Sequence, residues 1–212
     1  MNKKDKTERL LETSLKIFAR FGYKKTTVED IATELGMTKG NLYLYVRDKR
    51  DLYEKTVAHG LRRWQRNVIT SIENIPDIVD QLITICRKSY EYLSLDEDMR
   101  NVVINDPAIF PLYPEEDHFY RINIESMNIL KGLLQKGIDA GRFRPVDVDH
   151  LTDFIYSVYI MFVHKTYVKM EGKTVEAMFD AALDVILKGL LESANVLNQK
   201  YLVQPISASY IS

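Results

Sequence analysis

The segment from Thr26 to Asp51 constrains the fold of this chain most, because two short helical patterns flank a glycine in it. In the first pattern, apolar residues recur at positions i, i+3, i+4 and i+7 and so share one helix face. They are Val28, Ile31, Ala32 and Leu35. Thr26 or Thr27 can cap this helix, since each has an acidic residue three positions later, and Gly36 ends it. The pattern predicts a short amphipathic helix followed by a turn.

A second short helix is expected directly after the turn, with Thr38 as its cap. Its residues are too polar for a core segment, although Leu42 and Val46 supply an anchoring face. Two helices joined by a turn of three or four residues with a glycine form a helix-turn-helix, whose second helix lies in the DNA major groove. An ordinary helical hairpin has the same spacing, but the polarity of the second helix favours the helix-turn-helix.

The segment resembles the DNA-binding domain of the TetR family of bacterial transcriptional regulators. The resemblance rests on Phe21-Gly22, Thr26-Thr27-Val28-Glu29-Asp30-Ile31-Ala32, Gly36-Met37-Thr38-Lys39-Gly40-Asn41-Leu42-Tyr43, Tyr45, Asp48-Lys49 and Leu52. It covers about a quarter of the chain and is specific because many positions agree in register. Val46 departs from the family, which usually has an aromatic residue there. That difference concerns packing and leaves the expected DNA contacts unchanged.

Charge is divided unevenly along the chain. Residues 1–66 carry 16 Lys and Arg against 9 Asp and Glu, whereas residues 67–212 carry 13 against 21. The first third therefore has a net charge of +7 and the remainder −8, although the whole chain is close to neutral at −1. A basic segment can neutralise phosphates and release counterions, while an acidic one is repelled by the duplex. We expect DNA to meet only the N-terminal end.

Helical periodicity continues through the rest of the chain, and an all-α fold of about nine helices is expected. We divide the sequence into a helix-turn-helix domain (1–50), a connecting helix capped by Asp48 (51–74), an effector-binding and dimerisation domain (75–198) and a flexible tail (199–212). Pro76 restarts the chain, and three of the six prolines make 106–116 a loop. Helices are then expected at about 115–140, from Asp147 or Asp149 to about 170, and after Gly172.

The chemistry of the N-terminal domain suggests which side chains reach DNA. Thr27, Thr38, Tyr43, Tyr45 and Lys49 match positions that contact phosphates in the family, and the resemblance implies the same role here. Reading of bases needs donors on the groove-facing side of the second helix, where a lysine can reach guanine and an asparagine can pair with adenine. Lys39 and Asn41 are the candidates. Gly40, between them, lets the backbone approach the duplex closely.

Aromatic residues concentrate in the acidic part of the chain. Pockets between bundled helices are typically lined by apolar and aromatic side chains. The resemblance implies that this domain binds a small effector that shifts a dimer away from its DNA-binding conformation. Tyr90, Met127, Tyr159 and Phe162 are the candidate effector contacts, against the alternative that they are core residues. The resemblance also implies a homodimer in which the last two helices pair across a two-fold axis. The candidate interface residues are Phe179, Leu183, Ile186, Leu187 and Leu190, with core burial as the alternative.

Neither an enzyme nor a metal site is indicated. The four histidines are far apart, and His118 beside three acidic residues (115–117) is explained by a charged loop. The single cysteine, Cys86, lies in an apolar pattern and is read as a core residue in a reducing compartment. Without a secretory or membrane-spanning segment, a cytoplasmic location is expected, and no cofactor is implied.

Two functions remain after these exclusions. The first is a dimeric repressor that binds a palindromic operator in double-stranded DNA and is released by a small, largely apolar or aromatic effector. The alternative is a helical ligand-binding or scaffolding protein that uses its N-terminal unit for protein contacts.

Overall fold

The structure is a computed structural model that describes residues 3–111, 117–169 and 172–191; the predicted tail at 199–212 lies outside these ranges. Within them the chain folds into nine α-helices, and no strand forms apart from one isolated bridge between Phe143 and Leu191. The all-α fold expected from the sequence is confirmed.

The first three helices form the N-terminal unit. They are α1 (Lys3–Lys25), α2 (Val28–Glu34) and α3 (Lys39–Leu42). Thr27 caps α2 in a full capping box with Asp30, while the Thr26 hydroxyl donates to the Gly22 carbonyl at 2.9 Å. Gly22 adopts φ 74° and kinks the last turn of α1, because a glycine enters the left-handed region without strain. Gly36, with φ 65°, makes the turn between α2 and α3.

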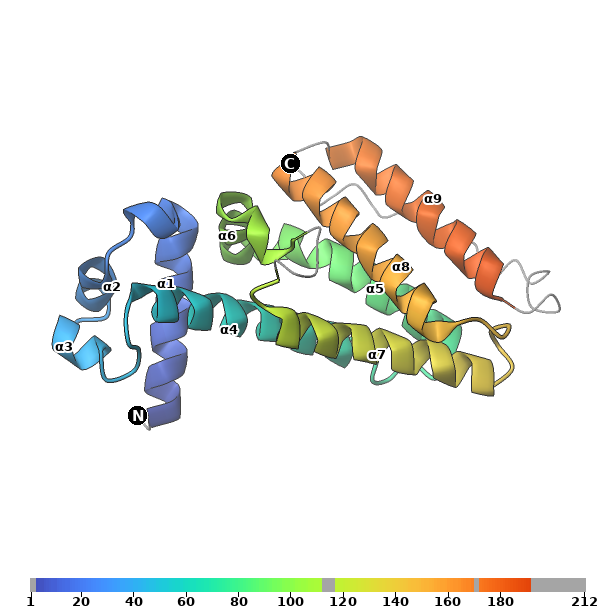
Figure 1. Cartoon of the computed structure of the whole chain (residues 1–212), viewed down its shortest axis with the longest axis horizontal. Coiled ribbons are helices and arrows are strands. Elements are labelled where there is room, and N and C mark those ends of the chain that lie inside the picture. Colours follow the sequence, from blue (N-terminus) through green and yellow to red (C-terminus); the bar gives the residue numbers. More distant parts are fainter. Residues whose placement is uncertain (1–2, 112–116, 170–171, 192–212) are drawn as a thin grey trace.

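Helix α4 (Lys49–Thr70) runs from the N-terminal unit into the rest of the molecule (Figure 1). Its cap is Asp48, as the sequence predicted, and the Asp48 carboxylate accepts from the Asp51 amide at 2.8 Å. One face of α4 is buried along its whole length, from Leu52 through Leu61 to Val68. Burial of a continuous apolar stripe explains why a long helix is stable here.

The remaining helices form the C-terminal bundle. They are α5 (Ile78–Leu95), α6 (Glu97–Asn105), a short 3-10 turn (Pro107–Ile109), α7 (Tyr120–Asp139), α8 (Val148–Val163), a π-helical turn (His164–Val168) and α9 (Gly172–Leu190). Within the described residues α7 begins at Tyr120, later than expected from periodicity. Asp147, rather than Asp149, caps α8, accepting from the His150 amide at 3.0 Å. Asp96 ends α5 and caps α6, which divides one long apolar pattern into two helices.

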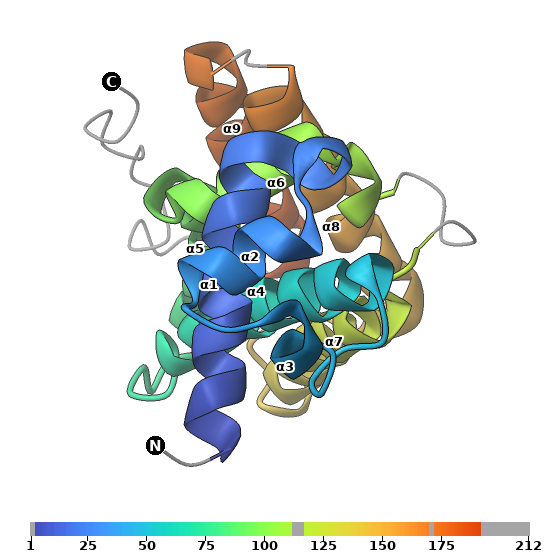
Figure 2. The ribbon, with the colours of Figure 1, turned by 90° about the vertical axis from the view of Figure 1, so that its left-hand side faces the viewer.

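Helix α1 lies across α4 and α6, so the N-terminal unit is packed against the bundle as well as joined to it by α4 (Figure 2). The Asn105 side-chain amide donates to the Ala19 carbonyl at 3.2 Å, and the Tyr53 hydroxyl donates to Asp106 at 2.8 Å. The unit that carries the helix-turn-helix therefore shares contacts with α6, at the edge of the bundle. A change in the bundle can reach the helix-turn-helix through these contacts.

Candidate DNA-binding surface and ligand pocket

The side chains predicted to contact DNA gather on the exposed side of α2 and α3. Thr27, Thr38, Lys39, Gly40, Asn41 and Tyr43 are exposed, and Tyr45 and Lys49 are partly exposed. The Thr38 hydroxyl oxygen accepts from the Asn41 amide at 3.2 Å, and that of Thr27 accepts from the Asp30 amide at 3.1 Å. A hydroxyl that accepts still has a proton to donate. Both caps can therefore donate to a phosphate while they hold their helices.

Lys39 is placed by its neighbours in the absence of DNA. Its ammonium group pairs with the Glu29 carboxylate and lies 5.9 Å from the centre of the Tyr43 ring. The hydrogen bond to Glu29 raises the pKa of Lys39, so the ammonium stays charged. Because both partners are exposed, the pair can exchange for a contact with DNA at little cost.

Lys49 and Tyr45 contact other residues near the surface of the N-terminal unit and of α4. The Lys49 ammonium donates to the Lys24 carbonyl at 3.4 Å and lies 4.4 Å from the centre of the Tyr23 ring. The Tyr45 carbonyl accepts from Lys55 at 3.0 Å. Sequence reasoning overlooked Leu44, which is 77% exposed directly after α3. Its exposure is set by how α3 ends and could not be read from the sequence.

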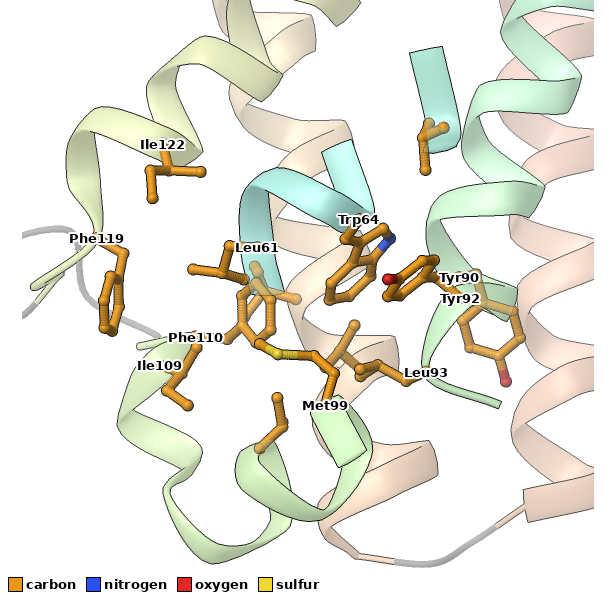
Figure 3. Close-up of a cluster of buried hydrophobic side chains, with 14 of the residues drawn as sticks. Leu61, Trp64, Tyr90, Tyr92, Leu93, Met99, Ile109, Phe110, Phe119 and Ile122 are labelled. Carbon is orange, nitrogen blue, oxygen red and sulfur yellow. The ribbon is translucent and has the colours of Figure 1, made fainter. Parts of the chain in front are cut away.

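A pocket of about 130 Å³ lies in the bundle, between α4, α5, α7, α8 and α9. Aliphatic and aromatic side chains make most of its wall, including Leu61, Trp64, Phe110 and Ile122 (Figure 3). Gln65, Ser89, Asn123 and Ser126 contribute polar groups. An engineered cavity of about 150 Å³ holds a benzene molecule. A ligand with more than one ring or a long chain would therefore push these helices apart.

The four predicted effector contacts fall into two groups. Tyr159 and Phe162 line the pocket, on one face of α8. Tyr90 lies behind the wall, where its ring stacks on Phe179 at 4.3 Å and its hydroxyl meets Thr166 at 2.8 Å. Met127, on α7, is half-buried and outside the lining. The polar lining residues of α4 and α7 were not anticipated, because periodicity does not reveal which polar side chains on different helices converge.

The five residues predicted for a dimer interface point into their own chain. Phe179, Leu183, Leu187 and Leu190 are buried, Ile186 is partly buried, and Phe179, Leu183 and Ile186 line the pocket. The opposite faces of the last two helices carry exposed apolar residues instead. These are Phe154 (54% exposed) and Met161 (36%) on α8, and Met178 (43%) and Val185 (69%) on α9.

A chain of contacts leads from the pocket wall to the N-terminal unit. The Trp64 ring stacks on Tyr92 at 4.9 Å, and the Tyr92 hydroxyl donates to Asp96 at 2.8 Å. Arg63 donates to Asp96 at 2.5 Å and to Glu12 of α1 at 2.6 Å. Burial would raise the pKa of Glu12, but hydrogen bonds and charge from His59 and Arg63 hold it below its ordinary value. Glu12 is therefore ionised near neutral pH, and Arg63 joins α1, α4 and α5.

Other kinds of site find no support in the described part of the chain. No three His, Cys, Asp or Glu side chains there are grouped so that they could hold a metal ion, and His118 is exposed. Burial raises the pKa of the Cys86 thiol to about 12, which keeps this pocket-lining group uncharged. Across the same ranges, no helix has both the length and the apolar character to cross a membrane.

Comparison with known proteins places these features in a family. The sequence model described as "Bacterial regulatory proteins, tetR family" matches residues 10–56, which span the helix-turn-helix. The HTH-type transcriptional regulator YerO of Bacillus subtilis is 25% identical, over 96% of this chain and 72% of its own length. The HTH-type transcriptional repressor KstR2 of Mycolicibacterium smegmatis is 27% identical, over 88% and 91% respectively.

A solved structure supports the fold over nearly the whole chain. The transcriptional regulator FadR from Bacillus subtilis, in complex with stearoyl-CoA, superposes with a TM-score of 0.70 at 19% identity. The match covers 86% of this chain and 98% of that one. Taken together, the helix-turn-helix, the bundle and these relatives establish that the chain belongs to the TetR family of bacterial transcriptional regulators.

Proposed function

We propose that the protein is a homodimeric repressor that binds a palindromic operator and leaves it when a small, largely apolar effector enters the bundle pocket. A relative named as a repressor and a structural neighbour in complex with stearoyl-CoA support both halves of this proposal. The proposal includes a division of the chain into three parts. They are a DNA-binding domain (1–50), a connecting helix (51–74) and an effector-binding and dimerisation domain (75–198).

The observation that carries the proposal is that α4 belongs to both sites. Its first two turns are joined to the N-terminal unit through Lys49 and Lys55, which donate to the Lys24 and Tyr45 carbonyls. Its later turns present Trp64, Gln65 and Val68 to the pocket. A ligand that displaces these side chains pushes on the helix that carries the helix-turn-helix. Binding free energies are coupled reciprocally. Bound DNA must therefore weaken binding of the ligand by the same factor as the bound ligand weakens binding of DNA.

The proposed DNA contacts divide by chemistry. Thr27, Thr38, Tyr43, Tyr45 and Lys49 donate to phosphates, which positions the protein without reading sequence. Lys39 and Asn41 read base edges, and Gly40 allows the helix to come close. The exposed Leu44 adds an apolar contact, since a thymine methyl group is the apolar feature of the major groove.

The proposed dimer uses the outer faces of α8 and α9. Exposed apolar side chains such as Phe154, Met161, Met178 and Val185 mark an interaction surface when they gather on neighbouring helices. Two N-terminal units held in one dimer can read two half-sites, which turns modest affinity into specific binding.

The central test is a gel-shift titration of the protein against the DNA upstream of its own gene, with unrelated DNA of equal length as control. We expect retardation of the upstream DNA at moderate salt and a steep loss of affinity as salt rises. If both DNAs are retarded equally, or neither is, the repressor function is wrong.

Substitution of Lys39 by alanine is expected to relax sequence preference, because it removes a donor to base edges. Discrimination between the operator and a single-base variant at the contacted pair should fall by about 1–3 kcal/mol. The matched change Tyr43→Phe removes a phosphate donor and should weaken all DNA sequences alike. Competition titrations with both DNAs measure the two effects. A uniform loss in both variants would contradict the assignment of Lys39 to a base.

Substitution of Arg63 by glutamine is expected to uncouple the pocket from the N-terminal unit. It removes the cation that lies between Glu12 and Asp96 and pairs with both of these partly buried carboxylates. Effector should then shift operator affinity by less than in the unmodified protein. Arg62→Gln is the matched control, since Arg62 is the exposed neighbour on the same helix. Operator affinity measured with and without effector checks this, and an unchanged shift in Arg63→Gln would exclude the Arg63 route.

A further inference from the structure

The tyrosines of the chain differ in what their hydroxyl groups contact. Tyr53, Tyr90, Tyr92 and Tyr167 have buried side chains, and each hydroxyl makes a hydrogen bond within the chain. This is the usual state, because a phenol taken out of water needs a partner. Tyr156 and Tyr159, on α8, pack against the same core, yet neither hydroxyl has a hydrogen-bond partner among the described residues.

Both unpartnered tyrosines line the pocket. Among the described residues, neither phenol oxygen is one of the fully enclosed polar side-chain atoms without a hydrogen bond, so neither is sealed inside the protein. Each hydroxyl therefore keeps some contact with accessible space, and both side chains form part of the pocket wall. Burial raises the pKa of Tyr159 well above its ordinary value and raises that of Tyr156 in the same direction. Each hydroxyl stays protonated and is able to donate.

Two of the other polar side chains at the pocket already have a donor engaged. The Gln65 amide donates to the Ser126 hydroxyl at 3.1 Å, and the Asn123 amide donates to Asp117 at 2.9 Å. Among the lining residues that the structure describes, none is a lysine, arginine, aspartate or glutamate. A carboxylate or ammonium group placed in this pocket would lose its hydration without gaining an opposite charge, which is strongly unfavourable.

We propose that the part of the effector that enters the pocket is an uncharged, largely hydrocarbon group with one oxygen acceptor, and that this oxygen accepts a hydrogen bond from Tyr159. The inference rests on the proposed function, because it takes the pocket as the effector site. A carbonyl or ether oxygen satisfies the description and a free carboxylate does not. Tyr156, whose ring centre lies 6.0 Å from that of Tyr159, is a second donor in the pocket wall.

This chemistry has two possible sources. One is a neutral small molecule, such as an ester or a ketone, that enters the pocket whole. The other is the acyl group of a thioester, whose large charged carrier stays outside the pocket. Both present a carbonyl oxygen on a hydrocarbon chain, and the experiment separates them.

Trp64 provides the signal for the experiment, since it is the only tryptophan in the sequence and lines the pocket. We would titrate the full-length protein with octane, octanoate, methyl octanoate and octanoyl-CoA at pH 7.5 and follow Trp64 fluorescence. Methyl octanoate is expected to bind at least about tenfold more tightly than octanoate, because the carboxylate must lose its hydration. Tighter binding of octanoyl-CoA than of the ester would identify the thioester source, and the reverse order the neutral one.

The variant Tyr159→Phe isolates the hydrogen bond. It should lower the affinity for methyl octanoate about fivefold and leave the affinity for octane unchanged, because octane has no hydrogen-bond acceptor. Tyr120→Phe is the control, since Tyr120 is an exposed tyrosine outside the pocket lining. A circular dichroism melt of each variant shows that it is folded.

Three results would overturn the inference: octanoate binding as tightly as its ester, equal ester affinity in Tyr159→Phe, or no fluorescence response to any probe. Equal ester affinity would mean that water satisfies the hydroxyl. Operator binding in the gel shift is measured separately, so a failed inference about the ligand is distinguishable from a failed repressor function.

Discussion

Replacement of Val185 by glutamate is expected to convert the proposed dimer to a monomer and to lower affinity for a palindromic operator by at least about 100-fold. Val185 is 69% exposed in the C-terminal half of α9, on the helix that also carries the exposed Met178. A carboxylate at the centre of an apolar interface loses its hydration in both subunits and finds no opposite charge. Because Val185 is exposed within the single chain, the fold of each subunit should be unaffected.

Sedimentation velocity and operator titration by fluorescence anisotropy measure the two parts of this result. The control is Leu95→Glu, which places the same charge at an exposed apolar residue of another helix, since Leu95 is 61% accessible at the end of α5. Binding to a single half-site should stay similar in both variants, since the N-terminal unit is untouched. A Val185→Glu protein that remains dimeric would place the interface elsewhere on the chain.

Replacement of Gly137 by alanine is expected to destabilise the protein by about 3 kcal/mol, because there is no room for a side chain at this position. A Cβ atom at Gly137 would lie 2.0 Å from the Phe143 ring, far inside van der Waals contact. Phe143 is 1% exposed and is held by backbone hydrogen bonds from its amide to Gly137 and from Arg144 to Leu190. The ring cannot retreat without breaking the connection between the end of α7 and the end of α9.

The same helix provides a matched control. Gly132 lies on α7, and a Cβ atom there meets nothing within 4 Å. Gly132→Ala should therefore stabilise the protein by up to about 1 kcal/mol through helix propensity. Thermal unfolding at one fixed protein concentration checks both, with melting temperatures expected to change in opposite directions by about 2–4 °C for each kcal/mol. A Gly137→Ala protein as stable as the parent would show that Phe143 repacks freely.

The N-terminal unit was largely predictable because its signals are local. Caps at Thr38 and Asp48 and the turn at Gly36 each depend on residues within a few positions, and the structure reproduces them. The choice between Thr26 and Thr27 as the cap of α2 was not predictable, since both have an acid three residues later. Thr27 takes the role while Thr26 is buried against the end of α1.

The bundle was predictable in its class and not in its surfaces. The apolar stripe of α9 was recognised, but periodicity alone does not say whether a stripe faces its own chain or a second one. The structure directs Phe179, Leu183 and Leu187 inward, and leaves Val185 and Met178 outside. The pocket could not be predicted from the sequence either, because its wall combines Trp64, Asn123 and Tyr159 from three helices that are distant in sequence.

Sequence was therefore sufficient for the all-α class and the helix-turn-helix, since both follow from patterns within one or two helical turns. It also sufficed for the division of charge along the chain, which is a matter of counting residues. The inward face of α9, the junction at Arg63 and the two unpartnered phenols of the pocket emerge only when the helices pack. They depend on distances between residues that are far apart in the chain, and those distances are set by the packing of the whole bundle.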